Sequence, residues 1–318
     1  MENAACYEQA ADCLRDAETA MHHAKAAGRG RQSSFSPEMN ARAKRLFSLG
    51  SDLHRAAVRG ELELDYQPVF GLPENRTVGF EALIRWRHPL RGRLMPSEFI
   101  TIAEDSGLIS AIGEWALLEA CRQAAAWRMA WIPPHDGSDA PAPWVAVNLS
   151  ARQLADPGLA DAVEAALAGA ALAADGLRLE VTESVLMTRP EMAIETLSGL
   201  QQKGIAISLD DFGTGYSSIQ TLDRLPVSTL KIDRGFVWRM DHPRGARMVT
   251  AIIQFAHVMD LEVVAEGVET AAQFRALADL GCSRVQGYYV AQPMSGEESL
   301  AWTGRPSPKW LAPEPVGL

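Results

Sequence analysis

The chain is poor in cysteine, with only four among its 318 residues. These are Cys6, Cys13, Cys121 and Cys282, and they form neither a CxxC pair nor a cluster with histidine. This spacing indicates neither a disulfide scaffold nor a zinc site. We therefore expect reduced thiols without a structural role of their own.

Long apolar runs and a secretory leader are also missing. The longest uncharged alanine-rich stretch spans residues 165–174, which is about half of what a bilayer crossing needs. The first residues, MENAAC, place acids and a cysteine where a signal peptide has a basic head and an apolar core. We expect a cytoplasmic protein without membrane contact from this chain, although a longer parent protein could be membrane-anchored.

Positive charge is scarcer than negative charge. The chain has 30 Lys and Arg against 40 Asp and Glu, a formal net charge of −10. A binder of duplex DNA needs a basic face for the phosphates, so this balance argues against one. The composition is 47% hydrophobic and 22% charged, which is typical of a globular protein and excludes a disordered chain or a coiled-coil rod.

Short apolar runs alternate with helical stretches after residue 61. Strands are predicted at 63–69, 78–84, 144–150, 177–181, 205–211, 229–233, 263–267 and 285–289. Helices are predicted between most of them, at 97–130, 152–172, 187–202, 216–225, 242–260 and 270–280. Eight strands with intervening helices in about 250 residues indicate an α/β fold, the (β/α)₈ or TIM barrel.

The connection between the first two strands departs from an ideal barrel. Residues 70–77 form a turn rich in Pro, Gly and Asn, which is too short for a crossover helix. The first two strands should therefore pair antiparallel, and we predict a modified TIM barrel with an antiparallel first strand. Helical patterns at 8–28 and 37–59 precede it. The first is too short to be stable alone, so it must pack on something or belong to a larger domain.

Each predicted strand carries a polar residue near its end. These residues are Gln67, Glu81, Asn148, Glu180, Asp210 with Asp211, Lys231 with Asp233, Glu266 and Gln286. In a barrel the carboxyl ends of the strands meet at one mouth, and a buried polar group is costly unless it has a partner. For one strand alone, a satisfied structural polar group is the simpler interpretation. The recurrence in all eight strands favours a single site.

The donors at this predicted site are oxygen atoms. The acids include Glu269 beside Glu266, and none of the seven histidines lies in the strands. Oxygen ligands select Mg²⁺ or Mn²⁺, and several carboxylates in one pocket need a cation because like charges raise one another's pKa. Asp210 and Asp211 can both reach the site only where the strand ends and the chain turns, because neighbours on a strand face opposite sides. Two-metal carboxylate sites are typical of phosphate-ester hydrolysis.

Two local features have two interpretations each. Lys231 is the only cation at these strand ends and could hold the attacking water or a phosphate oxygen, or form an ion pair with Asp233. Gly213 and Gly215 flank Thr214 after the fifth predicted strand. They suit a mobile lid that completes the metal site, or a simple turn from strand to helix.

Several motifs closely resemble the EAL-domain family of cyclic di-GMP phosphodiesterases. They are EALIRWRHP (81–89), VNLSARQL (147–154), EVTES (180–184), DDFGTGYSS (210–218), LKIDRGFV (230–237), VVAEGVET (263–270) and QGYYVAQP (286–293). The resemblance runs from about 47 to 305. It implies the modified barrel and hydrolysis of cyclic di-GMP to linear pGpG, which terminates second-messenger signalling. It also implies two Mg²⁺ or Mn²⁺ ions, with Ca²⁺ inhibitory.

The resemblance also implies roles for single residues. The positions that match ligands of the first metal are Glu81, Asn148, Glu180 and Asp210, and Asp211 and Glu269 match residues that help hold the second. Lys231 resembles the residue that contacts the catalytic water, and Glu266 resembles the general base, so these two and Glu81 form the implied catalytic set. Asp233 is similar to an acid that supports the site from behind its ligands.

Other matched positions concern the nucleotide and the loop. Those implied to lie near the nucleotide are Gln67, Arg85, Asp211 and Gln286, with Leu83 and Pro293 as wall residues. Glu183 resembles the acid that anchors the mobile loop of Gly213 and Gly215, a loop linked in the family to dimerisation and activation. A homodimer through barrel helices is therefore expected. The alternative is a receptor barrel that binds cyclic di-GMP without cutting it.

The helix at 15–31 is similar to the last helix of a GGDEF diguanylate cyclase domain, whose active-site motif is absent. The expected division is a GGDEF-like remnant at 1–36, a helical linker at 37–60, the phosphodiesterase barrel at 61–305 and a C-terminal tail at 306–318. On this interpretation the chain degrades cyclic di-GMP and does not make it.

Overall fold

The computed structural model describes residues 48–133, 140–214 and 219–303, together with a few positions between 13 and 36. Most of the proposed GGDEF remnant, the first part of the linker, Gly215 and the tail therefore lie outside the described residues. The strands of the described chain are β1 (Leu62–Gly71), β2 (Arg76–His88), β3 (Gly92–Leu94), β4 (Trp144–Leu149), β5 (Leu177–Thr182), β6 (Ala206–Phe212), β7 (Thr229–Ile232), β8 (Glu262–Ala265) and β9 (Arg284–Val285).

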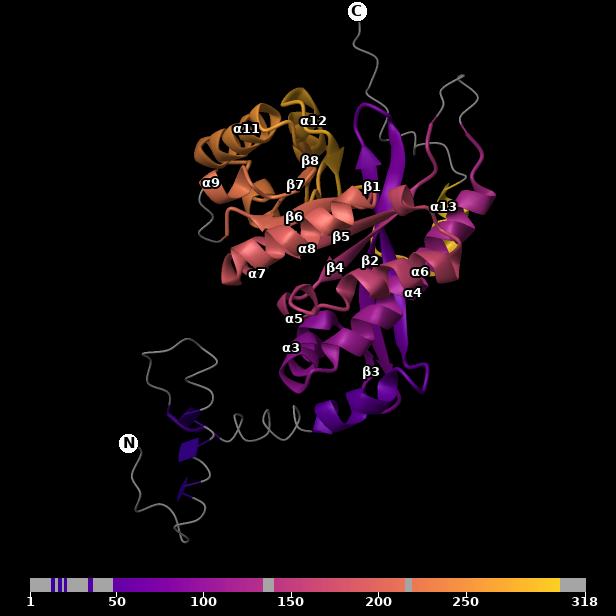
Figure 1. The fold of residues 1–318 in the computed structure, drawn as a ribbon. Coiled ribbons are helices and arrows are strands. Elements are labelled where there is room, and N and C mark those ends of the chain that lie inside the picture. Colours follow the sequence, from indigo (N-terminus) through magenta and orange to yellow (C-terminus); the bar gives the residue numbers. More distant parts are fainter. Residues whose placement is uncertain are drawn as a thin grey trace, which may run out of the picture.

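These strands form one closed sheet, and the modified TIM barrel is confirmed. The order is β1-β9-β8-β7-β6-β5-β4-β2-β3, and β1 also pairs with β2, which closes the barrel (Figure 1). β1 is antiparallel to both β2 and β9, while the pairs from β2 through β4 to β9 are parallel. The antiparallel first strand is thus also confirmed. The ninth strand, β3, forms a hairpin on the end of β2.

Helices cover the outside of the barrel (Figure 1). Their bounds are α3 (Pro96–Ser106), α4 (Ile109–Ala130), α5 (Ala151–Leu154), α6 (Leu159–Ala170), α7 (Glu183–Thr188), α8 (Pro190–Gln202), α9 (Ile219–Leu222), α10 (Arg234–Val237), α11 (Pro243–Val258), α12 (Ala271–Asp279) and α13 (Gly296–Thr303), with a 3₁₀ turn at Ala174–Gly176. A further helix covers residues 48–56. α3, α8 and α11 each begin at a proline, which suits the first turn because no backbone donor is needed there.

Several predicted elements differ from the structure, and one of them, the helix expected at 187–202, is divided between α7 and α8. The helix expected at 97–130 is two helices, because Gly107 adopts a left-handed conformation (φ 81°) that ends α3. The helix expected at 152–172 is broken around Pro157. The strand expected at 285–289 ends at Val285, because the chain turns at Gly287, where a Cβ atom would lie 2.2 Å from the backbone oxygen of Val268. The short α10 and the terminal α13 were not expected from the sequence.

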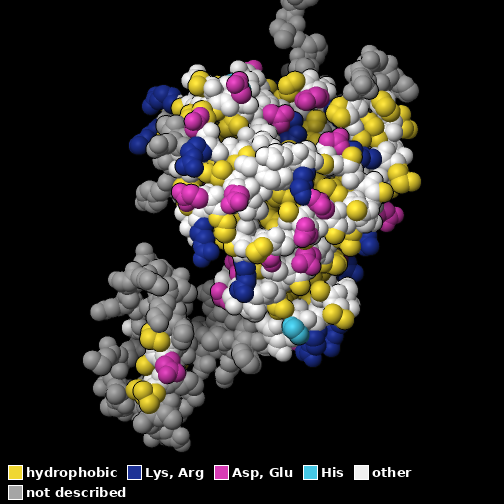
Figure 2. All heavy atoms as spheres, in the orientation of Figure 1, with side chains coloured by type: hydrophobic (Ala, Val, Ile, Leu, Met, Phe, Trp, Pro, Cys, Tyr) yellow, Lys and Arg dark blue, Asp and Glu magenta, His cyan; other side chains and the backbone are white. Residues whose placement is uncertain are grey.

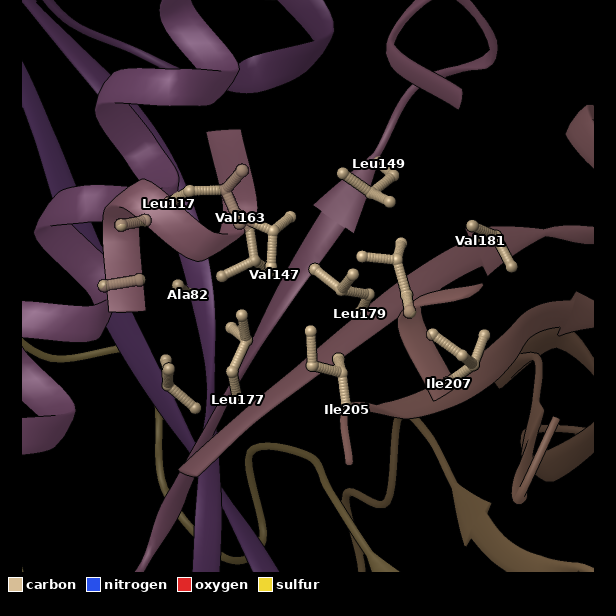
Figure 3. Packing of buried hydrophobic residues seen from close by; sticks show 14 of the residues in the cluster. Ala82, Leu117, Val147, Leu149, Val163, Leu177, Leu179, Val181, Ile205 and Ile207 are labelled. Carbon is tan, nitrogen blue, oxygen red and sulfur yellow. The ribbon is translucent and has the colours of Figure 1, made fainter. Parts of the chain in front are cut away.

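Alternation along the strands separates the core from the barrel interior. Figure 3 shows Val147 and Leu149 of β4 and Leu179 of β5 gathered with Leu117 of α4 and Val163 of α6, and all five side chains are buried. Because successive side chains point to opposite faces, the residues between them face the inside of the barrel. The packing of this core therefore turns Asn148 and Glu180 toward the barrel axis.

A second, smaller core lies outside the barrel. Leu49 and Leu53 of helix 48–56 are buried with Trp86 of β2 and Phe99 of α3. His88, also on β2 and buried, lies 3.3 Å from Asp52 of the same helix. The last part of the predicted linker is thus packed on the extension that β2 and β3 form beyond the barrel.

The described surface carries charges of both signs. Figure 2 shows Asp and Glu side chains interspersed with Lys and Arg over the visible face. Among the helices that the structure describes, none combines the length and the apolar character needed to cross a bilayer.

Candidate active site

The carboxyl ends of the strands meet around one buried ammonium group, that of Lys231 on β7. Its Nζ lies 2.6 Å from Glu180 Oε2 on β5 and 2.7 Å from Glu266 Oε1, just after β8. It also lies 3.5 Å from Glu81 Oε2 on β2 and 3.5 Å from Asp210 Oδ1 on β6. The side chain of Lys231 is only 2% exposed. Residues from four strands and one strand end thus converge as the barrel geometry predicts.

An amide network holds one of these carboxylates in place. Asn148 Nδ2 donates to Glu81 Oε1 at 2.8 Å, and Gln286 Nε2 donates to Glu81 Oε2 at 2.7 Å. Gln286 Nε2 also donates to Gln67 Oε1 at 3.1 Å. The buried Gln286 Oε1 has no hydrogen-bond partner in the described part of the chain. The side chains from β1, β2, β4 and the segment after β9 therefore belong to the same site as Lys231.

The carboxylates of Asp210 and Asp211 lie close together at the end of β6. Asp211 has a positive φ of 56°, and the register of β6 against β7 shifts at this point. Its backbone N–H donates to Asp210 Oδ1 at 2.8 Å. A left-handed conformation is costly for residues other than glycine, although Asp tolerates it better than most. This turn brings oxygen atoms of Asp210, Asp211 and Glu266 within 4.8 Å of one another, close enough to hold a cation.

The pKa values reflect an excess of buried negative charge. Burial would raise the pKa of Glu81, but Lys231 and the two amide hydrogen bonds bring it below its usual range. Burial raises the pKa of Glu180 well above its usual range and that of Glu266 to about 8, in each case against the opposing effect of Lys231. Four carboxylates also keep the pKa of Lys231 high despite burial. One ammonium group cannot neutralise four carboxylates. Such an excess of negative charge is typical of a cation-binding centre.

Two other predicted residues lie around the loop after β6 and before α10. Glu183 is buried at the start of α7, and its Oε2 accepts a hydrogen bond from the Gly213 N–H at 3.0 Å. Asp233 accepts from the Gly235 N–H at 2.9 Å and caps α10. The ion pairs of Lys231 within the described residues do not include Asp233. The second loop glycine, Gly215, lies outside the described residues.

Glu269 stands apart from the carboxylate cluster. It is exposed at the start of α12, and its backbone N–H donates to Gln273 Oε1 at 2.9 Å. The group of acids that lie close enough to hold a cation in the described residues contains Glu266 and does not contain Glu269.

The residues predicted to contact a nucleotide extend from the mouth toward the β2–β3 hairpin. Arg85 is buried on β2, and Leu83 lies opposite Asp65 in the β1–β2 register. Pro293 lines a cavity of about 360 Å³ together with Asp65 and Arg93. Sequence reasoning missed Asp65 and Arg93. A signal existed for Asp65, which precedes Gln67 by two residues and so faces the same side of β1.

Known proteins resemble this chain over the whole barrel. The EAL domain family model matches residues 51–293. The bifunctional diguanylate cyclase/cyclic di-GMP phosphodiesterase MucR of Pseudomonas aeruginosa is 45% identical over 292 residues, which are 91% of this chain and 41% of MucR. The cyclic di-GMP phosphodiesterase PdeR of Escherichia coli K12 is 38% identical over 294 residues, 92% of this chain and 43% of PdeR. The chain thus spans about two fifths of the length of these curated relatives.

Solved structures show the same fold. The PaMucR phosphodiesterase in complex with c-di-GMP superposes with a TM-score of 0.73 at 45% sequence identity, covering 79% of this chain and 99% of that one. The range matched by the family model contains the described barrel strands and the residues that surround Lys231. The chain belongs to the EAL domain family.

Proposed function

We propose that this chain is a phosphodiesterase that hydrolyses cyclic di-GMP to linear pGpG and so terminates the signal carried by the cyclic nucleotide. The observation that carries the proposal is the convergence of Glu81, Glu180, Asp210 and Glu266 on Lys231 at the barrel mouth. The activities named for MucR and PdeR support the choice of substrate, as does the nucleotide bound in the PaMucR structure.

The donor set fits divalent cations. Oxygen atoms of Asp210, Asp211 and Glu266 lie within 4.8 Å of one another, and oxygen ligands suit Mg²⁺ or Mn²⁺. The proposed ligands are Glu81, Asn148, Glu180 and Asp210 for one ion, with Asp211 and Glu269 helping to hold a second. When bound, such cations neutralise phosphate charge and acidify water. We expect Ca²⁺ to occupy the site and inhibit.

The chain's own groups supply the remaining chemistry. The proposed reaction adds water to one phosphorus atom and breaks one P–O bond of the ring, so a proton must leave the water and another must reach the departing oxygen. Glu266, whose Oε1 lies 2.7 Å from Lys231 Nζ, is placed to accept the first proton, and positive charge from bound cations would keep its carboxylate deprotonated near neutral pH. Lys231 stays charged beside it and would stabilise the negative charge that develops on the phosphate.

The nucleotide would lie across the mouth, between the amide network and the hairpin. Gln67 and Gln286 donate and accept near the reacting phosphate, while Arg85 offers a cation to the dianionic ligand. Leu83 and Pro293 are proposed as the apolar walls of this cleft. Asp211 belongs to both proposed sets, because it would help to hold the second cation and also lie near the nucleotide.

The decisive experiment is a turnover assay with cyclic di-GMP. With Mg²⁺ or Mn²⁺ the chain should release pGpG, and a chelator should stop it. Glu81→Ala should lose activity because it removes a proposed ligand, while Glu195→Ala, an exposed acid on α8, should keep it. Binding of the nucleotide in Ca²⁺ without turnover in Mg²⁺ or Mn²⁺ would instead support the receptor. If the chain neither binds nor hydrolyses cyclic di-GMP, both the phosphodiesterase and the receptor function are ruled out.

We further propose that the chain comes from a longer protein with a GGDEF-like remnant at 1–36, a linker at 37–60, the barrel at 61–305 and a tail at 306–318. The burial of Leu49 and Leu53 against the β2 extension supports a linker that is attached to the barrel at its end. A homodimer through barrel helices and a cytoplasmic location complete the proposal. Size-exclusion chromatography with light scattering tests the dimer.

A further inference from the structure

A buried ion pair lies at the outer edge of the proposed nucleotide cleft. Arg85 Nε on β2 lies 3.0 Å from Asp65 Oδ2 on β1, and the two side chains are 5% and 6% exposed. Arg85 Nη1 also donates to the backbone oxygen of Ile84 at 2.9 Å. The guanidinium is therefore held at two of its three nitrogen atoms, and it keeps further N–H donors that a ligand could use.

A second arginine reaches the same carboxylate from the hairpin. Arg93 of β3 contacts the other oxygen of Asp65 through Nη2, and its Nε donates to Glu63 Oε1 at 2.7 Å. Glu63 also binds Arg87 at 2.6 Å. Three arginines against two acids leave this network with a net charge of 3 − 2 = +1. Asp65 is the only member that contacts both Arg85 and Arg93 among the described contacts.

Four members of the network, but not Arg85, line an open space. A cavity of about 360 Å³ is lined by Glu63, Asp65, Arg87 and Arg93 on the hairpin side and by Pro293 and Glu298 on the other. Pro293 is also a proposed wall of the nucleotide cleft. Because Glu298 balances the extra arginine, net charge does not favour an anionic ligand here, and the recognition of a nucleotide phosphate would depend on the free N–H donors of Arg85.

We propose that Asp65 is a positioning residue for nucleotide binding, which holds the Arg85 guanidinium in its binding orientation and is itself oriented by Arg93. This inference rests on the proposed function. Without Asp65, Arg85 would be a nearly buried charge without its ion-pair partner, and it would leave its present position to reach water. Nucleotide binding would then have to fix the orientation of the Arg85 side chain again, and this entropy cost would weaken the affinity.

The proposal predicts an effect on KM. A substrate contact made equally in the ground state and the transition state changes KM and leaves kcat nearly constant. A hydrogen bond to a charged group contributes enough that its loss weakens binding by about 10- to 100-fold. Asp65→Asn, which removes the charge and keeps the shape, should therefore raise KM for cyclic di-GMP by about that factor. It should weaken nucleotide binding in Ca²⁺ to the same extent.

A double-mutant cycle separates this role from a merely structural one. Kinetics in Mg²⁺ are compared for the full chain, Asp65→Asn, Arg85→Gln and the double variant. If Asp65 acts through Arg85, Asp65→Asn has no further effect on KM once Arg85 is replaced. An equal increase of KM in both backgrounds overturns the proposal, and so does a lower KM, which would mean that Asp65 competes with the nucleotide for Arg85.

A second variant keeps the test open if Asp65→Asn does not fold. The side chain of Arg93 is 49% exposed, so Arg93→Gln should fold, and it should raise KM about threefold or more by loosening Asp65. Unchanged KM in Arg93→Gln overturns the part played by Arg93. Turnover by the unmodified chain with unchanged KM in Asp65→Asn overturns the positioning role alone. An unmodified chain that neither binds nor cuts cyclic di-GMP overturns the proposed function as well.

Discussion

Lys231 should be the main support of the barrel mouth when no divalent cation is present. Its ammonium group lies 2.6 Å from the buried carboxylate of Glu180, 2.7 Å from the partly exposed carboxylate of Glu266 and 3.5 Å from two more. Lys231→Met removes the charge and keeps most of the side-chain volume. The carboxylates of Glu180 and Glu266 then have no cation in a buried site, which is the costly half of a broken ion pair.

The expected loss follows from the burial of both partners. The side chain of Lys231 is 2% exposed and that of Glu180 is 5% exposed, so solvent screens this pair little. Removal of one partner from such a pair costs about 3–5 kcal/mol of the free energy of unfolding. The exposed pair of Lys203 and Glu164, with side chains 44% and 52% exposed, provides a control. Lys203→Met should cost no more than about 1 kcal/mol.

The loss should depend on pH and on divalent cations. Burial would raise the pKa of Glu81, and Lys231 is the main group that holds it below its ordinary value of 4.5. In the unmodified chain this carboxylate contributes stability above pH 4.5, whereas in Lys231→Met burial raises its pKa, so stability is lost as the pH rises above 4.5. The deficit of Lys231→Met should therefore be small at a pH of about 5 and large at about 8.

Urea unfolding with a chelator and with Mg²⁺ provides the measurement. Mg²⁺ should stabilise Lys231→Met more than the unmodified chain, because the cation replaces the missing positive charge. Equal losses for Lys231→Met and Lys203→Met would refute the reasoning. So would a deficit that stays the same between pH 5 and pH 8.

Two further predictions concern stability away from the mouth. At the opposite end of the barrel, Glu262 pairs with Arg178 and Arg284, and the Arg178 guanidinium lies 4.2 Å from the centre of the Trp144 ring. Glu262→Gln should lower the free energy of unfolding in urea by about 1–3 kcal/mol, less than for a fully buried pair because Glu262 is 42% exposed; no loss would contradict this account. Burial raises the pKa of Tyr66 well above its ordinary value of 10.0, so stability should fall as the pH rises above that value. Tyr66→Phe should show a smaller fall in the urea midpoint between pH values of about 9 and 11, and equal falls would refute it.

The barrel could be predicted from the sequence because its signals are local. Apolar runs of strand length alternate with helical stretches, and the short connection at 70–77 forces the first two strands to be antiparallel. The strand-end residues follow from the same argument, because parallel strands in a barrel end at one mouth. This argument alone was enough to predict that Glu81, Glu180 and Asp210 lie together at the mouth.

The missing parts of the prediction depend on tertiary contacts. Arg93 reaches Asp65 only because β2 continues past the barrel and returns as β3, which no local pattern indicated. The sequence left an ion pair of Lys231 with Asp233 open, yet the carboxylates of three other strands and Glu266 surround Lys231 more closely. Gly287 ended the last strand early because its backbone approaches Val268, a residue far away along the chain.

The reversed first strand would allow one mouth to combine the proposed hydrolysis with binding of the proposed dinucleotide. In an ordinary barrel every strand ends at the mouth, so its recognition surface comes from the loops that follow. Here β1 begins above the mouth, and β2 pairs with it from Leu62 onward. This pairing continues the barrel wall into an extension made of β1, β2 and β3, which carries Asp65, Arg85 and Arg93, while Gln67 and Glu81 pair directly below. β2 thus carries both a proposed metal ligand, Glu81, and the proposed nucleotide-binding arginine, Arg85, and β1 pairs with it at both positions.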